Sequence, residues 1–213
     1  MVRDGIPVRR ERLVSNEQGA ALMEFAITLP LLVVFVVGIY DFSGAFNQKQ
    51  KIEQAAQEGA IVAGAQPMSD VQTTTGNPDS LQPVVFAIFN SLASSGVLPN
   101  ANQGTCKMPP PAPTQGTPPG LAWTYTISGC SSGTAVGDNL VIIVNRGCVC
   151  AAGPTCTAVP PCASGPPVSV GTVVTITYPY HWRFNSLIQL LVPGATYAAT
   201  TQLTESATVH NQM

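Results

Sequence analysis

The stretch Gly19-Ala20-Ala21-Leu22-Met23-Glu24-Phe25 opens an apolar run that continues to Tyr40 and decides the fold of this chain. No charged residue interrupts the run after Glu24. Counted from Ala20, the segment has about the 20 residues that a helix needs to cross a bilayer. A carboxylate within hydrocarbon costs roughly 2 to 3 kcal/mol. We therefore predict a transmembrane helix over residues 20–40 and a functional role for Glu24.

The charges beside this segment predict its orientation. Four arginines precede it, and the first lysine after it is Lys49. Positive flanks stay in the cytoplasm, so the N-terminus is expected there and the rest of the chain is expected to be exported. Pro30 lies inside the segment, where its ring and missing N–H are expected to kink the helix. The sequence thus indicates a single-pass protein of the inner (cytoplasmic) membrane.

The composition excludes several classes of protein. Only 9% of the 213 residues are charged, the net charge is −2 and no basic tract is present, which argues against nucleic-acid binding. No nucleophile–base pair, phosphate loop or paired-carboxylate site is visible, so we expect no enzyme and no cofactor. The exported acids are expected to be solvated; they are Asp41, Glu53, Glu58, Asp70, Asp79, Asp138 and Glu205.

The helix is expected to continue beyond the membrane. Apolar residues recur there at spacings of three and four, with one skip at Lys49. This stripe predicts an exported helical extension over residues 41–65, ended by Gly64 and Pro67 and packed on the chain's own head or on copies of itself. The stripe consists of Phe42, Ala45, Phe46, Ile52, Ala56, Ala60 and Ala63.

These residues resemble a known family. The stretch Gln18 to Ala26, the pair Leu29-Pro30, and the segments Gly38 to Phe42 and Ala55 to Ala60 closely resemble the TadE/TadG-like pilus-assembly proteins. Gly19 followed by Glu24-Phe25 resembles the type IV prepilin cleavage motif, in the short-leader form of Flp and other Tad (tight adherence) pilus subunits. The resemblance covers about residues 13 to 63. Where the family usually has Arg after the last of these segments, the chain has Ile61.

The resemblance implies a maturation step. A prepilin peptidase would cut between Gly19 and Ala20, which makes residues 1–19 a cytoplasmic leader. Glu24 and Phe25 would serve peptidase recognition and assembly, with the Glu24 carboxylate pairing with the freed Ala20 ammonium of a neighbouring subunit. Such pairing removes the cost of two isolated charges in lipid. The implied partners are prepilin peptidase, other Tad pilus or pseudopilin subunits and the inner-membrane assembly platform.

Two other interpretations fit the same N-terminus. The apolar run is close to the length of a signal-peptide core, and Ser43-Gly44-Ala45 is a small-residue cleavage site. Alternatively, the segment is an uncleaved anchor in which Glu24 is interfacial. The mature chain would begin at Ala20 after peptidase cleavage, at Phe46 after signal-peptide cleavage, and at neither if the anchor is uncleaved.

The remainder, residues 66–213, is predicted to form an extracytoplasmic domain, which gives the chain an α+β fold. Ser80 is expected to cap a second helix, whose apolar positions from Leu81 to Leu92 recur at helical spacing and which Gly96 ends. About four antiparallel strands are expected, over residues 122–128, 139–145, 168–178 and 197–210. Pro179 is expected to end the third of these, with the rings beside His181 covering the core.

Six cysteines lie in this exported part, in stretches rich in glycine and proline. An even number in loop-rich segments predicts structural disulfides in an oxidising compartment, although the sequence does not choose among 15 pairings. Metal binding is less favoured, because the gaps between the last four cysteines differ from the two-residue spacing of zinc ribbons. The candidates are Cys106, Cys130, Cys148, Cys150, Cys156 and Cys162.

Two functions follow as hypotheses. The first is a non-catalytic minor pilin or pseudopilin-like component of a Tad pilus assembly or secretion system. The second is a membrane-anchored extracytoplasmic binding or adhesion module that does not enter a filament. Copurification with pilus-assembly machinery would distinguish them.

Overall fold

A computed structural model describes residues 17–71, 77–115, 121–131, 138–150, 157–158, 169–182 and 200–212. The chain divides into two compact units, residues 1–40 and residues 41–213. One helix, α1 (Glu17–Ala65), contributes to both. The helix continues through Pro30, and the kink expected there stays a prediction.

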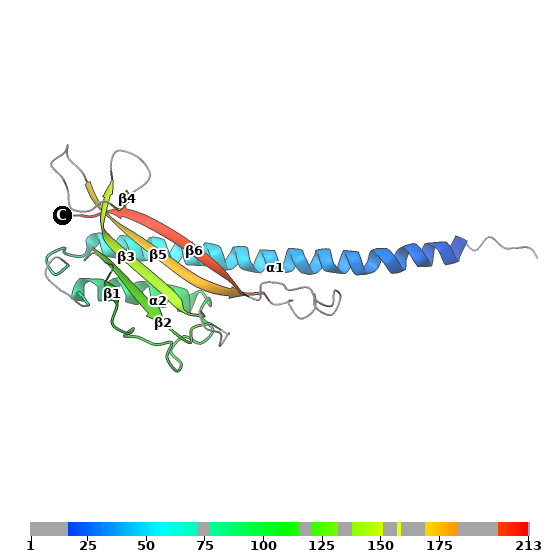
Figure 1. Cartoon of the computed structure of the whole chain (residues 1–213), viewed down its shortest axis with the longest axis horizontal. Helices are drawn as coiled ribbons and strands as arrows, with labels where there is room; N and C mark the ends of the chain where they lie inside the picture. The colour runs from blue at the N-terminus through cyan, green and yellow to red at the C-terminus, as the bar shows by residue number, and fades with distance from the viewer. Residues whose placement is uncertain are drawn as a thin grey trace, which may run out of the picture. The chain divides into compact units, whose positions relative to one another are not determined.

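The second unit combines helices with one antiparallel sheet, which confirms the α+β class (Figure 1). The strand order is β1-β2-β3-β5-β6, and β4 pairs with β3 outside this path. Four of the strands correspond to the four expected from the sequence, while the two-residue strands β1 and β4 were not predicted. The elements are η1 (Asp79–Leu81), α2 (Gln82–Ser94), β1 (Thr114–Gln115), β2 (Ala122–Ile127), β3 (Leu140–Cys150), β4 (Thr157–Ala158), β5 (Ser169–His181) and β6 (Thr200–His210).

The core lies between one face of the sheet and two helices, which are α2 and residues 41–65 of α1 (Figure 1). Alternate residues of the strands point into it, as the two-residue period of a strand requires. The two helices pack tightly at Gly59 of α1, because a Cβ there would overlap Cγ1 and Cδ1 of Ile88. The largest buried apolar side chains are Trp123, Tyr125, Phe89, Ile52, Leu81, Ile88, Leu92, Ile127, Leu140, Ile142 and Ile176.

Only part of the predicted apolar stripe on α1 is buried. Phe42 and Phe46 are 64% and 62% exposed, whereas the five other members of the stripe are buried. The buried face instead passes through Asp41, Ala45 and Ile52, so the two phenylalanines lie on an adjoining face of the helix. The members that prove buried are Ala45, Ile52, Ala56, Ala60 and Ala63.

The second helix forms as expected, but its start differs. Its apolar positions are buried, and it ends before Gly96, whose φ is +73°. Ser80 does not cap it: Ser80 lies within the 3-10 turn η1, and its N–H donates to Oδ2 of Asp70 at 2.7 Å. The residue at the N-cap is Leu81, followed by a proline in the first turn, where no N–H is needed.

The expected break at Pro179 is wrong. Strand β5 continues through it, with Pro179 opposite Gln202 of β6. The last residue of β5 with a partner in β3 is Thr177, so one side of β5 is open at Pro179 and a missing N–H is tolerated there. Tyr178 and Tyr180 are buried, which confirms that rings of this segment cover the core.

Candidate functional site

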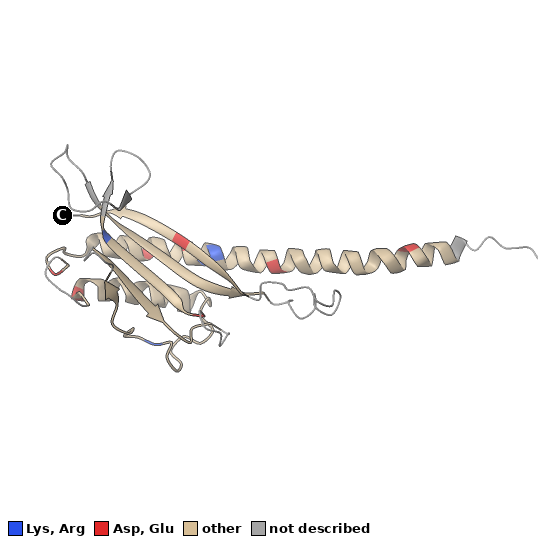
Figure 2. Cartoon of the chain, viewed as in Figure 1, with Lys and Arg blue, Asp and Glu red and all other residues tan. Residues whose placement is uncertain are grey.

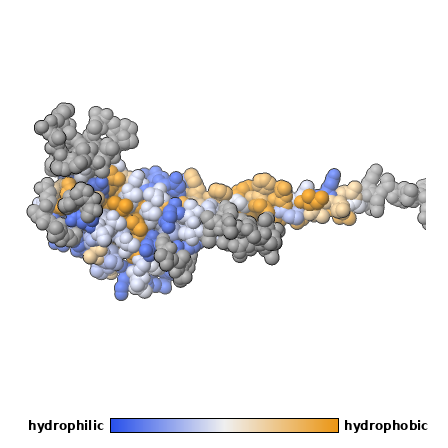
Figure 3. All heavy atoms as spheres, in the orientation of Figure 1, coloured by the Kyte–Doolittle hydropathy of each residue, from blue (hydrophilic) through white to orange (hydrophobic). Residues whose placement is uncertain are grey.

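The first unit presents apolar side chains to its surroundings. Residues from Leu22 to Tyr40 are exposed or nearly so, with values of 70% at Met23 and 72% at Ile27 (Figure 3). This is the one helix among the described residues that is long and apolar enough to cross a membrane. An uncovered apolar surface of this extent is unfavourable in water, so lipid or protein must cover it.

Glu24 is the only charged residue between Gly19 and Tyr40, and Figure 2 shows one acidic position in this part of the helix. Its side chain is exposed. One turn later, Oγ1 of Thr28 donates to the carbonyl oxygen of Glu24 at 2.9 Å and to that of Phe25 at 3.3 Å. The threonine hydroxyl is therefore satisfied within the helix, as an apolar environment requires. The Glu24 carboxylate, in contrast, would need a partner from outside this segment in an apolar environment.

Gly19 and Ala20 lie in α1. Glycine weakens a helix by about 1 kcal/mol relative to alanine, so Gly19 lowers the stability of the helix beside this bond. Ala20 and Glu24 are four residues apart and share one helix face. Their role in processing stays a prediction.

At the other end of α1, a buried arginine replaces the missing helix partners. Arg146 of β3 is fully buried. Its Nη2 donates to the carbonyl oxygens of Ala63 at 3.0 Å and Gln66 at 2.7 Å, and its Nη1 donates to that of Pro67 at 2.9 Å. Because the last turn of α1 contains no basic residue, this side chain supplies the positive charge that a helix C-terminus favours.

Asp70 lies beside this arginine. Burial raises the pKa of its carboxyl, but hydrogen bonds from Ser80 and the charge of Arg146 outweigh that effect, so the net pKa is lowered below 3.8. Conversely, burial lowers the pKa of Arg146, and the charge of Asp70 opposes that change. The pair links the end of α1 to the turn before α2.

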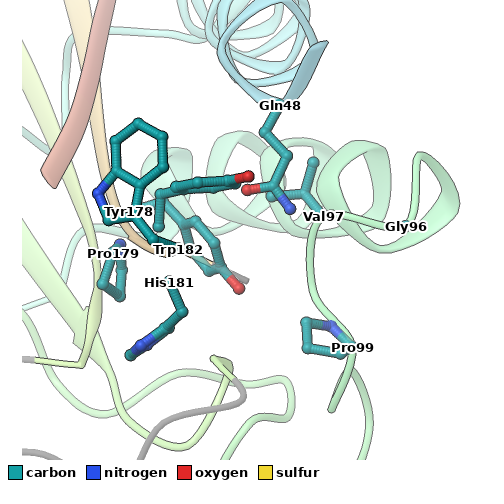
Figure 4. Close-up of a pocket in the computed structure, with 9 residues that line it drawn as sticks. Gln48, Gly96, Val97, Pro99, Tyr178, Pro179, His181 and Trp182 are labelled. Atoms are coloured by element: carbon teal, nitrogen blue, oxygen red, sulfur yellow. The ribbon is translucent and has the colours of Figure 1, made fainter. Parts of the chain in front are cut away.

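A cavity of about 380 Å³ opens between α1, the loop after α2 and the end of β5. Gln48 reaches it from the helix, Val97 and Pro99 from the loop, and His181 and Trp182 from the strand end (Figure 4). The remaining lining residues are Gly96, Tyr178, Pro179 and Tyr180.

Aromatic contacts hold the strand end that lines this cavity. Trp182 packs edge to face on Phe42 and on Tyr180, with ring centroids 5.4 and 5.1 Å apart. Its Nε1 donates to Oγ1 of Thr201 at 2.8 Å, and the Tyr180 hydroxyl donates to the Asp41 carbonyl oxygen at 3.3 Å. These contacts fix the ring positions before any ligand arrives.

An acid–histidine pair lies beside the same cavity. Nε2 of His181 is 3.2 Å from Oδ1 of Asp138, which is buried. Burial, together with the charge of Asp138, raises the pKa of Tyr178 to about 12, so its hydroxyl stays protonated at neutral pH. Asp41 and Asp138 are both buried, so the expectation that the exported acids are all solvated is wrong for these two.

One predicted disulfide is described: Cys106 is bonded to Cys130. The side chains of Cys148 and Cys150, and the whole of Cys156 and Cys162, lie outside the described residues. Within the described ranges, no group of three or more histidine, cysteine or acidic residues could hold a metal ion. The pairing of the other four cysteines stays a prediction.

Comparison with protein families identifies the N-terminal segment. Residues 19–60 match the TadE-like proteins. The match confirms the resemblance found in the sequence, and it begins at Gly19, ahead of the carboxylate and the exposed apolar helix. This TadE-like segment indicates a component associated with a Tad pilus. Neither the comparison with curated proteins nor the comparison with solved structures found a match.

Proposed function

We propose that this protein is a non-catalytic minor pilin or pseudopilin-like component of a Tad pilus assembly or secretion system. Prepilin peptidase matures it between Gly19 and Ala20. The mature chain is anchored by residues 20–40, with its second unit on the extracytoplasmic side. The assembly platform and other Tad subunits are its partners.

The single observation that carries this proposal is the TadE-like match over an exposed apolar helix with one carboxylate. The match begins at the residue before the proposed cut. Glu24 then lies four residues after the new N-terminus, within an otherwise uncharged segment. An ammonium and a carboxylate that are each costly in lipid stabilise each other when paired, which favours association through this end of the helix.

The disulfide between Cys106 and Cys130 supports the proposed location of the second unit. Structural disulfides persist in oxidising compartments and are rare in the cytosol. The arginines before the apolar segment favour the same orientation.

Intact-mass analysis of protein purified from membranes tests the maturation step. The expected mature chain begins at Ala20, and Gly19→Arg is expected to keep the leader, because a long side chain does not fit a groove that accepts glycine. Gly38→Ala, in open space on the same helix, serves as the control and should be cleaved normally. A chain that begins at Phe46, or an uncut chain in cells with active peptidase, would contradict the proposal.

The role of Glu24 in assembly is tested separately. Glu24→Gln is expected to leave cleavage intact and to reduce copurification with pilus-assembly components, because an uncharged amide cannot neutralise the Ala20 ammonium. Glu53→Gln, which changes an exposed acid of the second unit, should have no effect. If Glu24→Gln and Glu53→Gln copurify with the same amount of pilus-assembly components, the proposed charge pairing is wrong.

The cavity beside β5 favours a second candidate, an anchored binding or adhesion module that stays outside the filament. Its lining rings and polar groups are typical of ligand sites. This candidate predicts an anchored protein that binds a ligand but does not copurify with pilus components.

A further inference from the structure

The cavity at the end of β5 has the size and lining of a peptide-binding site. Its volume of about 380 Å³ falls in the lower part of the range of small-ligand pockets, roughly 300 to 1,000 Å³. Three aromatic residues of β5 and its end, Tyr178, Tyr180 and Trp182, line it together with Pro99 and Pro179. Pockets lined by rings in this way accept proline-rich segments, whose rigid polyproline II shape costs little entropy to bind.

Polar groups in the cavity match the backbone of such a segment. The protonated Tyr178 hydroxyl can donate to a peptide carbonyl, and polyproline II carbonyls have no internal partner. Oε1 of Gln48 is buried and has no hydrogen-bond partner among the described residues, so it lacks a donor. A buried acceptor without a donor is costly, about 1 to 3 kcal/mol, which a ligand N–H at this place would relieve.

The chain itself carries a segment with this chemistry. Residues 108–113 read Met-Pro-Pro-Pro-Ala-Pro, and Pro109, Pro111 and Ala112 are exposed. Between Pro109 and Pro113, Ala112 provides the only backbone N–H. We infer that this aromatic cavity binds the proline-rich segment 108–113 of a second copy of the chain.

A chain cannot readily fill its own cavity, because both ends of the segment are held beside β2. Thr114 pairs with Thr124 of β2, and on the other side the Thr105 hydroxyl donates to the carbonyl oxygen of Ser128, just past the end of that strand. Strand β2 is two places from β5 in the sheet, about 10 Å at the usual strand spacing, and none of residues 108–113 lines the cavity of its own chain. The occupant therefore comes from another molecule.

The contact joins two different surfaces, a cavity on one copy and a segment on the next. A head-to-tail contact of this kind does not close on itself unless its rotation forms a ring, so it generates open chains of subunits. The inference stands apart from the proposed maturation step, because it concerns only residues of the second unit and is measured without peptidase or other pilus components.

Fluorescence anisotropy tests it with the full chain purified in detergent. A labelled peptide of residues 107–115 is titrated with protein, beside the same peptide with its four prolines replaced by alanine. The native peptide is expected to bind at least tenfold more tightly than the alanine peptide. Gln48→Ala and Tyr178→Phe are each expected to weaken binding of the native peptide at least threefold. Gln57→Ala, an exposed glutamine on the same helix, should leave binding unchanged.

The remaining outcomes overturn the inference. It fails if neither peptide binds, if both bind equally, or if Gln48→Ala and Tyr178→Phe both bind the native peptide like the unmodified protein. An unrelated proline-rich peptide that binds as tightly as residues 107–115 would show a general proline site and would contradict the assignment to a second copy. Near-ultraviolet circular dichroism verifies that each variant retains its fold.

Discussion

Nη2 of Arg146 donates a hydrogen bond of 2.7 Å to the carbonyl oxygen of Gln66, one residue past the end of the longest helix of the protein. The same guanidinium also reaches the carbonyl oxygens of Ala63 and Pro67. Helix ends leave carbonyl groups without partners, and buried ones need a donor. A strand residue therefore supplies donors to three carbonyl groups at the end of α1, while backbone N–H groups of Gln66 and Gln212 donate to Ala63 and Gly64.

Arg146→Met is expected to destabilise the second unit by about 3 to 5 kcal/mol, because it removes the hydrogen bonds to three carbonyl groups at the end of α1 and leaves Asp70 without its positive neighbour. Arg146→Lys should recover less than half of this loss, since one ammonium cannot reproduce the fork of the guanidinium. Urea unfolding followed by circular dichroism measures both. Lys107→Met, at an exposed position, is the matched control, and a similar loss there would contradict the assignment.

Gly59→Ala is expected to destabilise the protein by about 1 to 3 kcal/mol, because the added Cβ overlaps the side chain of Ile88 where α1 meets α2. Adding Ile88→Val removes the Cδ1 atom 2.6 Å from that Cβ and should recover part of the loss. The thermal midpoints of the two single variants and the double variant measure the coupling. Additive losses in the double variant would show that the two residues do not press on each other.

Asp70 is expected to make stability depend on pH in the acid range. Its pKa in the folded chain is lowered below 3.8, so the folded state favours the ionised form. This stabilisation is complete above the unfolded pKa and is lost as the pH falls below 3.8 toward the folded value. Asp70→Asn should lower the thermal midpoint at pH 7 and flatten its fall between pH 5 and pH 3.

Asp79→Asn serves as the control for that experiment, because Asp79 is exposed and lies in the turn that Asp70 contacts through Ser80. Its pH profile should follow that of the unmodified protein. Asp70→Asn would contradict the expectation if its midpoint fell with acid as steeply as that of the unmodified chain.

Replacing both Cys106 and Cys130 with alanine is expected to cost about 3 kcal/mol, because their bond closes a loop across 24 positions of the chain and restricts the unfolded state. Denaturant titration of the double variant measures the loss. The unmodified protein under reducing conditions provides a second measurement, and a loss well below 1 kcal/mol in both would contradict a structural role for this bond.

Much of the fold could be predicted from local patterns. The apolar run after Glu24, the spacing from Leu81 to Leu92 and the β-branched stretches around Ile142 and Ile176 each indicate one element type and one buried face. In β3, Leu140, Ile142 and Val144 are buried at every second position, and the same period reaches position 146. This alternation in the sequence therefore indicates that Arg146 points into the core.

The rest depends on contacts between distant residues. The sequence places Asp138 in a polar turn, and only the fold brings it to His181 and away from water. Likewise, a proline interrupts a strand only where its N–H would be needed for pairing. Strand β3 pairs with β5 only as far as Thr177, so Pro179 does not need an N–H on that side. Phe42 fits a helical stripe, but the sheet contacts the adjoining face of α1.

The hydrogen bonds from Arg146 to the C-terminal end of α1 also have a consequence for the synthesis of the chain. Eighty positions separate Gln66 from Arg146, and a ribosome that adds about 5 to 20 residues each second needs roughly 4 to 16 s to synthesise them. Throughout that interval the helix has been made, while the donor that completes its final turn has not. A nascent chain stopped before this arginine would carry the entire TadE-like segment and still lack the side chain that binds the C-terminal end of α1.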